Sequence, residues 1–207
     1  RKISQSYEIP VTVFSHFPNL FLNHPCIKNS FHINDSKKGY KILNTFFNGK
    51  TLINGEEVEF KHAQIDIRQF HALSLGFTLT PEEMEMDLYV EEDWNVWFKD
   101  FIIIHPVQTW ASRTWDINKW QDLIIELNNQ SIPVIAIGKD TSENGFHQID
   151  KPVMDINIPY GINLMNNPNS SLPKLRNLFK KAKCIITMDS GMLHLAGTTH
   201  TEIIQLG

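Results

Sequence analysis

The sequence has little cysteine and no metal-binding spacing. Its 207 residues include only two cysteines, Cys26 and Cys184, which lie far apart in different contexts. Such usage is typical of a reducing compartment, so we expect a cytoplasmic protein with both thiols in the core. The nine histidines are scattered, and neither a C-x-x-C nor an H-E-x-x-H pattern occurs. The sequence therefore predicts neither a zinc site nor any other bound metal.

A surplus of positive charge and long apolar runs are also absent. The formal net charge is −4 and the sequence pI is about 6.1, which disfavours a nucleic-acid partner. No run approaches the 18 or more apolar residues of a membrane-spanning helix. With 42% hydrophobic and 20% charged residues, the composition is that of an ordinary globular protein.

Expected strands and helices alternate along the chain. Short apolar, β-branched runs predict strands at residues 9–14, 27–33, 86–90, 101–105, 132–137, 153–156, 184–187 and 202–206. Amphipathic spacing and turn signals predict helices or helical turns at 17–23, 62–75, 116–130, 172–182 and 192–198. Residues 40–60 are ambiguous, although Asn48-Gly49 and Asn54-Gly55 are hairpin dipeptides. The alternation predicts an α/β fold with a parallel sheet.

Residues 76–92 indicate a boundary between two domains, 1–92 and 93–207, and the acidic residues from Glu82 to Asp93 make this the most acidic stretch. Charge runs usually form a solvated face, and we prefer that interpretation. The alternative, a metal site, lacks a partner set, because no convincing D-x-D motif is present.

Residues 184–207 read as strand, tight turn, helix and strand, and this corner suits an anion. Ser190 is expected to cap the helix with its side chain, while Gly191 leaves room for a phosphate to approach the backbone. Helix N-termini attract anions through unpaired N–H groups and the dipole. His194 lies about one turn into the helix. From spacing alone, a well-capped turn with a histidine satisfied in the core remains the alternative.

Two sequence blocks carry a family resemblance. The run DSGMLHLAG at 189–197 resembles the D-S-G-x-x-H-L-A signature of glycosyltransferase family 9, the ADP-heptose:lipopolysaccharide heptosyltransferases. The second block, IIIHP at 102–106 followed by Gln108-Thr109, Arg113-Thr-Trp115 and Trp120, resembles the family's strand, H-P-G-x-S/T loop and following helix. Val107 stands where the family usually has glycine. It therefore stays open which of Gln108, Thr109 and Ser112 faces the phosphate.

The resemblance implies a GT-B fold of two Rossmann-like domains with parallel sheets, the N-terminal domain being incomplete. It implies an inverting, metal-independent transferase that needs no cofactor and moves a sugar, such as heptose, from a nucleoside-diphosphate donor. The acceptor would be a glycan or the lipopolysaccharide core. A lipid-linked acceptor would bring the protein to the inner face of the membrane, although the sequence locates no patch for such contact.

The resemblance also implies roles for particular residues. Asp189 would bind sugar hydroxyls, Ser190 and Gly191 would offer backbone N–H groups to the pyrophosphate, and His194 would donate to a phosphate. Thr109 and Arg113 would hold the pyrophosphate, with Arg113 stabilising the leaving nucleoside diphosphate. Glu143, or alternatively Asp140, would lie near the ribose. Trp110, Trp115 and Trp120 are stacking candidates for the base, but helix packing explains the last two better.

The resemblance implies that the general base is an aspartate in an early G-D loop. Residues 1–207 contain no such loop. We expect this base upstream of Arg1 and a chain that is inactive by itself. Two other functions remain: a sugar-nucleotide epimerase on the same fold, and a non-catalytic module that binds a nucleotide or glycan. The sequence does not indicate the acceptor, the nucleobase of the donor or the oligomeric state.

Overall fold

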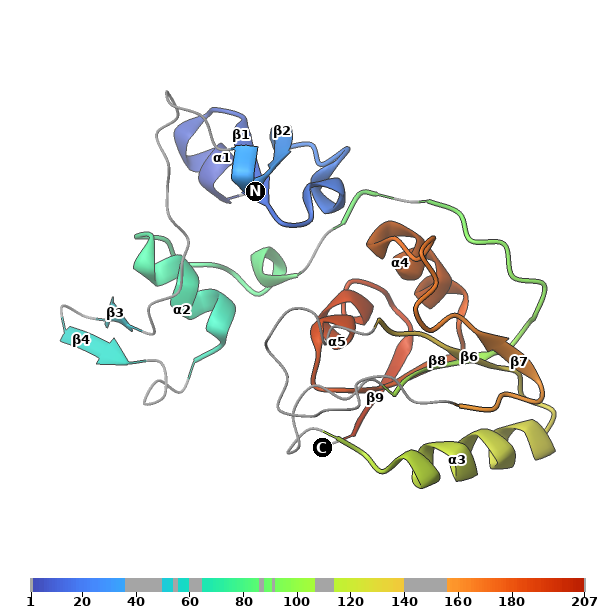
Figure 1. The fold of residues 1–207 in the computed structure, drawn as a ribbon. Coiled ribbons are helices and arrows are strands. Elements are labelled where there is room, and N and C mark those ends of the chain that lie inside the picture. The colour runs from blue at the N-terminus through green and yellow to red at the C-terminus, as the bar shows by residue number, and fades with distance from the viewer. Residues whose placement is uncertain are drawn as a thin grey trace. The chain divides into compact units, whose positions relative to one another are not determined.

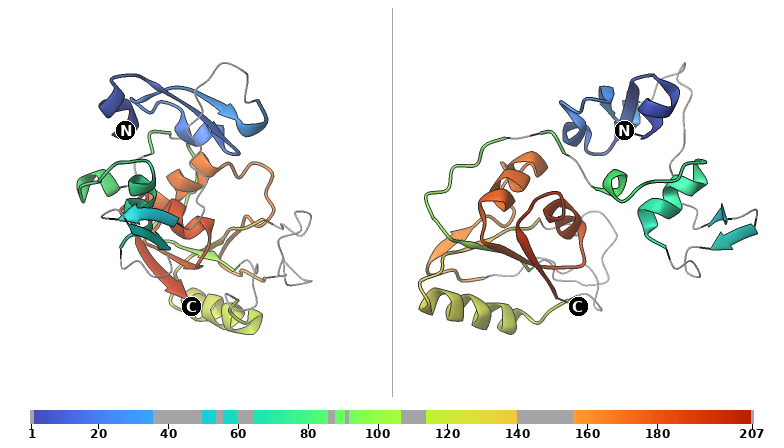
Figure 2. Two further views of the ribbon diagram at one scale, coloured as in Figure 1. Left: turned by 90° about the vertical axis from the view of Figure 1, so that its left-hand side faces the viewer. Right: turned by 180° about the vertical axis from the view of Figure 1, so that it is seen from behind.

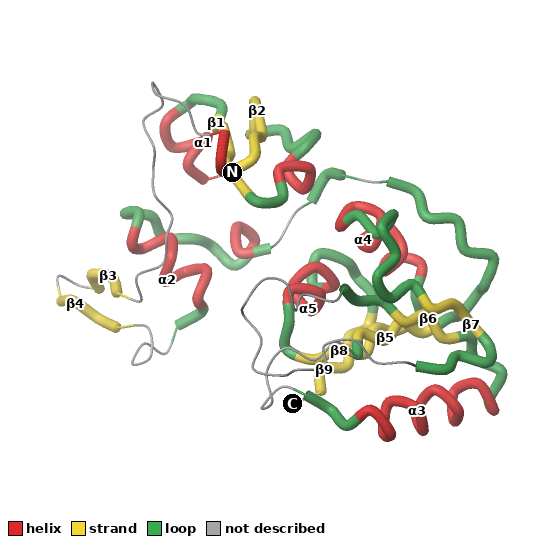
Figure 3. Tube along the Cα trace, viewed as in Figure 1, coloured by secondary structure: helices red, strands yellow, loops and turns green. Residues whose placement is uncertain are grey.

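The chain forms two compact units, an N-terminal unit (Arg1–Val90) and a C-terminal unit (Glu91–Gly207) (Figure 1). The computed structural model describes residues 2–35, 50–53, 56–59, 65–85, 88–90, 92–106, 114–139 and 156–206. Figure 3 shows how helices and strands are distributed along the trace. In this described part, no helix is long and apolar enough to cross a bilayer.

The N-terminal unit begins with a pair of parallel strands. Its first elements are α1 (Lys2–Tyr7), β1 (Val11–Ser15), the 3₁₀ helix η1 (Pro18–Phe21), β2 (Ile27–His32) and η2 (Ile33–Asp35). The strands pair from Val11 opposite Ile27 to Ser15 opposite His32. The Ser30 hydroxyl donates to the Pro18 carbonyl at 2.8 Å and fixes η1 against β2. The expected strands at 9–14 and 27–33, and the helical turn between them, are confirmed.

A hairpin and a helix follow in the same unit. The elements are β3 (Lys50–Ile53), β4 (Glu56–Glu59), α2 (Ile67–Ser74) and the 3₁₀ helix η4 (Glu82–Met84). The antiparallel strands pair Ile53 with Glu56, as expected for strands that flank Asn54-Gly55. The strand expected at 86–90 is wrong over the described residues 88–90, which form no ladder although Val90 is buried.

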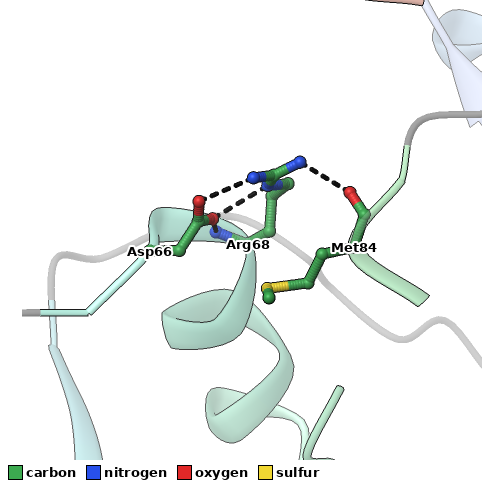
Figure 4. A network of polar contacts seen from close by, with 3 residues as sticks. All are labelled: Asp66, Arg68 and Met84. Carbon is green, nitrogen blue, oxygen red and sulfur yellow. Dashed lines mark hydrogen bonds and ion pairs between the residues drawn. The ribbon is translucent and has the colours of Figure 1, made fainter. Parts of the chain in front are cut away.

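Asp66 caps α2 and holds an arginine that reaches the next element (Figure 4). The Arg68 backbone N–H donates to Asp66 Oδ1 at 2.8 Å. The Arg68 guanidinium donates to both Asp66 carboxylate oxygens, at 2.9 and 2.7 Å, and to the Met84 carbonyl at 2.6 Å. The bonds that Asp66 accepts from Arg68, led by those from the side chain, lower the pKa of Asp66 to about 2. The network ties α2 to η4.

The C-terminal unit is built on a five-stranded sheet whose neighbouring strands are all parallel. Its strands are β5 (Ile102–His105), β6 (Val134–Ala136), β7 (Gly161–Asn163), β8 (Cys184–Met188) and β9 (Glu202–Leu206). The spatial order is β7-β6-β5-β8-β9. The chain therefore builds outward from β5 to one edge and then returns to β8 to build the other. The parallel sheet predicted from the sequence is confirmed.

Among the described residues, three helices cover this sheet, α3 (Ile117–Asn129), α4 (Leu172–Lys181) and α5 (Gly191–Ala196). Figures 1 and 2 show α3 on one face and α4 with α5 on the other. Side chains alternate between the faces of a strand. Ile102, Ile104, Cys184 and Ile186 accordingly pack in one cluster with Trp120 and Ile124 of α3. The intervening residues of β5 and β8 are thereby directed to the side of α4 and α5.

The helix boundaries follow their caps. Asp116 accepts a bond from the Asn118 N–H at 2.7 Å and starts α3 where the sequence predicted. Ser171 caps α4 in the same way, at 3.3 Å from the Lys174 N–H. Two basic residues, Lys180 and Lys181, complement the dipole in the last turn of α4.

The strand predicted at 153–156 falls mostly on residues outside the described part of the chain. Its one described residue, Ile156, is buried but not in a strand. The edge strand is β7, which pairs Gly161 with Val134 and Ile162 with Ile135. Asn128 of α3 holds its start, because its amide donates to the Tyr160 carbonyl and its oxygen accepts from the Tyr160 N–H, both at 2.9 Å.

Candidate functional site

The two strands that carry the sequence motifs, β5 and β8, are neighbours at the point where the strand order reverses. The chain leaves β5 toward α3 on one face and leaves β8 toward α5 on the other (Figure 2). In open α/β sheets, ligands bind outside the carboxyl ends of the strands at such a switch point. The topology therefore singles out the ends of β5 and β8 as the candidate site.

A buried histidine links the two strand ends. His105 and Thr187 are directly paired in the parallel ladder and share the face of α4 and α5. His105 Nδ1 lies 3.2 Å from Thr187 Oγ1 and 3.4 Å from Ser190 Oγ. The two hydroxyl oxygens are 3.3 Å apart, and Thr187 also donates to the Met188 carbonyl at 3.1 Å. The polar chain runs from buried Thr187 to half-buried Ser190.

Burial keeps the His105 ring neutral. Its residue is only 8% exposed, and loss of solvation of the imidazolium lowers the pKa of His105 to about 4. A neutral imidazole has one N–H donor and one bare acceptor nitrogen. The ring can therefore orient hydroxyl groups at neutral pH without adding charge.

Ser190 does not cap α5 with its side chain, contrary to the expectation. Its backbone is extended, as at an N-cap, but no cap hydrogen bond forms. The hydroxyl contacts Thr187 and His105 instead. The competing buried partners, which spacing alone does not reveal, explain the difference.

The other described motif residues lie on the same turn and helix. Asp189 is half-buried directly after β8, and Gly191 is exposed at the first position of α5. A side-chain carbon added to Gly191 would meet no atom within 4 Å, so protein packing does not require this glycine. His194 is exposed, which contradicts the alternative of a histidine satisfied in the core. His105, rather than His194, is the histidine of this region that is buried.

Several predicted site residues lie outside the described part of the chain: Thr109, Trp110, Arg113, Asp140 and Glu143. Trp115 and Trp120 are described, and their rings meet edge to face at 5.0 Å. Trp120 is fully buried in the core against the sheet. The packing interpretation of these two tryptophans is therefore confirmed.

An arginine that the sequence did not single out steadies α5. Arg176 of α4 is 7% exposed and donates to the Thr198 hydroxyl at 3.0 Å and to the Thr198 carbonyl at 3.1 Å. Thr198 in turn donates to the Leu195 carbonyl at 2.7 Å. The far end of α5 is thereby fixed to α4. The sequence did offer a signal for this role, because the apolar periodicity of α4 places Arg176 among its buried positions.

The comparisons with known proteins agree with the motifs. A sequence model of glycosyltransferase family 9 (heptosyltransferase) matches residues 62–206. No curated protein matches the chain. Among solved structures, it is similar to TibC, a bacterial iron-containing dodecameric glycosyltransferase from enterotoxigenic E. coli H10407. The TM-score is 0.67 at 16% identity, covering 99% of this chain and 51% of that one.

Two further structures are similar. Dodecameric iron-containing heptosyltransferase TibC in complex with ADP-D-β-D-heptose gives a TM-score of 0.69 at 17% identity, over 99% of this chain and 51% of that one. E. coli heptosyltransferase WaaC with ADP gives 0.40 at 19% identity, over 52% and 33%. The similarity to TibC confirms the predicted α/β fold of GT-B type. The chain spans about half the length of the TibC chain.

The described residues do not reproduce a metal centre. Within them, no three His, Cys, Asp or Glu side chains gather in a group that would hold a metal ion. That part of the chain therefore offers no set of ligands for iron of the kind that TibC contains.

Proposed function

This chain belongs to glycosyltransferase family 9, and from that premise we propose that its C-terminal unit binds a nucleoside-diphosphate sugar at the carboxyl ends of β5 and β8. The protein would transfer the sugar to a glycan or lipid-linked acceptor, such as a lipopolysaccharide core. One observation supports the site above all others. The two motif blocks, distant in sequence, meet at the switch point through His105, Thr187 and Ser190.

In the proposed site, the loop after β5 would supply a positive charge and the turn after β8 would supply backbone N–H donors. Arg113, with Thr109, would hold the pyrophosphate and stabilise the leaving nucleoside diphosphate as the glycosidic bond breaks. Asp189 would bind sugar hydroxyls, while Ser190, Gly191 and His194 would contact phosphate. Glu143 would lie near the ribose. Family resemblance supports these roles, and the described positions of 189–194 at the end of β8 are compatible with them.

The donor we propose is ADP-heptose. The family match and the fold shared with TibC, which was solved with ADP-D-β-D-heptose, support this choice. Transfer would invert the anomeric centre and proceed without a metal, as the family resemblance implies. The N-terminal unit would serve the acceptor side.

Nucleotide selectivity tests the proposal. In a calorimetric titration of the chain with ADP, UDP, GDP and CDP, we expect selective binding of ADP. Arg113→Ala should weaken that binding by about tenfold or more, since it removes a charge-assisted hydrogen bond worth about 1.5–3 kcal/mol. Selective UDP or GDP binding would retain the site but reject ADP-heptose. Binding of none of the four would contradict a donor site at these strand ends.

The same titration has a matched pair of glycine variants. Gly191→Ala meets no protein atom, so folding should be unaffected, yet the methyl group would stand where a phosphate approaches the backbone. We expect ADP affinity to fall by about tenfold, which is 1.4 kcal/mol. Gly197→Ala, at the other end of α5 with φ −60°, should leave affinity unchanged. Equal affinities for the two variants would place the phosphate elsewhere.

A further inference from the structure

The hydrogen bonds at the switch point depend on which ring nitrogen of His105 has the proton. The positions of the neighbouring oxygen atoms indicate which nitrogen that is. Burial keeps the ring neutral, so only one nitrogen is protonated. Nδ1 is the nitrogen that faces the hydroxyls of Thr187 and Ser190. The direction of every hydrogen bond in the chain depends on this choice.

The Met188 carbonyl decides the direction at Thr187. A carbonyl oxygen only accepts, and Thr187 Oγ1 donates its single proton to it at 3.1 Å. Thr187 Oγ1 then has only lone pairs to offer to His105 Nδ1 at 3.2 Å. A bare Nδ1 would place two acceptors against each other at a fully buried site, which is costly. The arrangement that pairs a donor with an acceptor at each of these contacts therefore has the proton on Nδ1.

The consequence reaches the surface through Ser190. Its Oγ lies 3.4 Å from the same Nδ1, whose single proton is shared between the Thr187 and Ser190 oxygens in a three-centre bond, so the Ser190 proton remains for another partner. Thr187 Oγ1, at 3.3 Å, can receive that proton while no ligand is bound. With the opposite tautomer, Ser190 would instead donate inward to Nδ1 and present lone pairs outward, which would repel a phosphate.

We propose that His105 is a positioning residue that keeps its proton on Nδ1. The Ser190 hydroxyl is thereby left to donate a hydrogen bond to a phosphate of the bound nucleotide sugar. The part concerning phosphate rests on the function proposed above. The part concerning the tautomer does not, because it follows from contacts among the protein's own groups. The two parts have separate tests.

The tautomer is measured directly, without nucleotide. Long-range ¹H–¹⁵N correlation spectra at neutral pH distinguish Nδ1–H from Nε2–H rings, and the His105 signals among the nine histidines are those lost in His105→Asn. We expect the Nδ1–H form. An Nε2–H ring, or an imidazolium at neutral pH, would overturn the proposal even if ADP binds well. The readout is taken on the wild-type chain, and His105→Asn serves only to assign the His105 signals.

The effect on ligand binding is tested with two replacements of the ring. In His105→Asn the side-chain amide restores an N–H donor near the Nδ1 position, whereas His105→Leu is apolar. We expect ADP affinity within about threefold of wild type for Asn and about tenfold weaker for Leu, at equal melting temperatures. His200→Asn, an exposed histidine, is the matched control and should bind like wild type.

The outcomes separate the two proposals. Equal ADP affinity for His105→Asn and His105→Leu would overturn the positioning role while the donor site stands. Absence of ADP binding by the wild-type chain would overturn the donor site and the role of Ser190, whereas an Nδ1–H spectrum would still support the assigned hydrogen-bond directions.

Discussion

Replacing Gly161 with alanine should strongly destabilise the C-terminal unit. Gly161 opens β7 with φ +152°, and an added Cβ would lie 1.8 Å from the Val134 carbonyl oxygen and 2.7 Å from its carbon. Both atoms belong to the backbone of β6, next to which β7 is paired. Relief would require breaking that pairing, so we expect a loss of more than about 4 kcal/mol in the free energy of unfolding. Urea denaturation followed by circular dichroism measures it.

Two other glycines calibrate this result. Gly76 has φ +79° but open space around it, so Gly76→Ala should cost only backbone strain, about 1 kcal/mol. Gly191→Ala meets neither strain nor contact and should be neutral or slightly stabilising at the start of a helix. A Gly161→Ala protein as stable as the Gly76→Ala protein would show that β7 does not pair with β6 as described.

Lowering the pH should decrease the free energy of unfolding of the C-terminal unit through His105. The pKa of this histidine is lowered by burial to about 4 in the folded chain, against 6.5 for an unperturbed histidine. Between these values the unfolded chain binds the proton and the folded chain does not. Stability from this group is therefore complete above about pH 6.5 and is lost as the pH falls toward 4. The full effect is about 3 kcal/mol, since a pKa difference of one corresponds to 1.36 kcal/mol.

The measurement compares wild type with His105→Asn in urea unfolding at pH 7 and pH 4.5. Carboxylates titrate in both proteins, so only the difference between the two pH dependences reports His105. We expect the wild type to lose about 2 kcal/mol or more beyond the loss in the variant. Parallel pH dependences would mean that His105 is solvated or paired with a charge, contrary to its burial.

The motif corner of the C-terminal unit was largely predictable from the sequence. Ile102–Ile104 and Cys184–Ile186 are continuous apolar, β-branched runs, as buried parallel strands require, and α3 has a clear cap at Asp116. Chain order then predicted strands that point the same way. Which strands become neighbours is a long-range matter, and only the structure shows that β5 lies against β8.

What the sequence could not give was set by tertiary contacts. β7 contains one apolar residue, Ile162, between Gly161 and Asn163, so its pattern does not resemble a strand, and pairing with β6 creates it. Ser190 has good capping chemistry, but buried partners claim its hydroxyl. A histidine after three isoleucines and a threonine late in an apolar strand were visible signals. Their meeting depended on the register of β5 and β8.

An amide chemical-shift titration of the ¹⁵N-labelled chain with ADP locates the nucleotide most directly. A donor site at the switch point predicts the largest shifts at the ends of β5 and β8, around His105 and residues 188–192, and in the adjoining residues 107–113. The far end of α3, at Asn128 and Asn129, should not respond. Large shifts there, or none at the ends of β5 and β8 at saturating ADP, would contradict a nucleotide-sugar site built on these two strands.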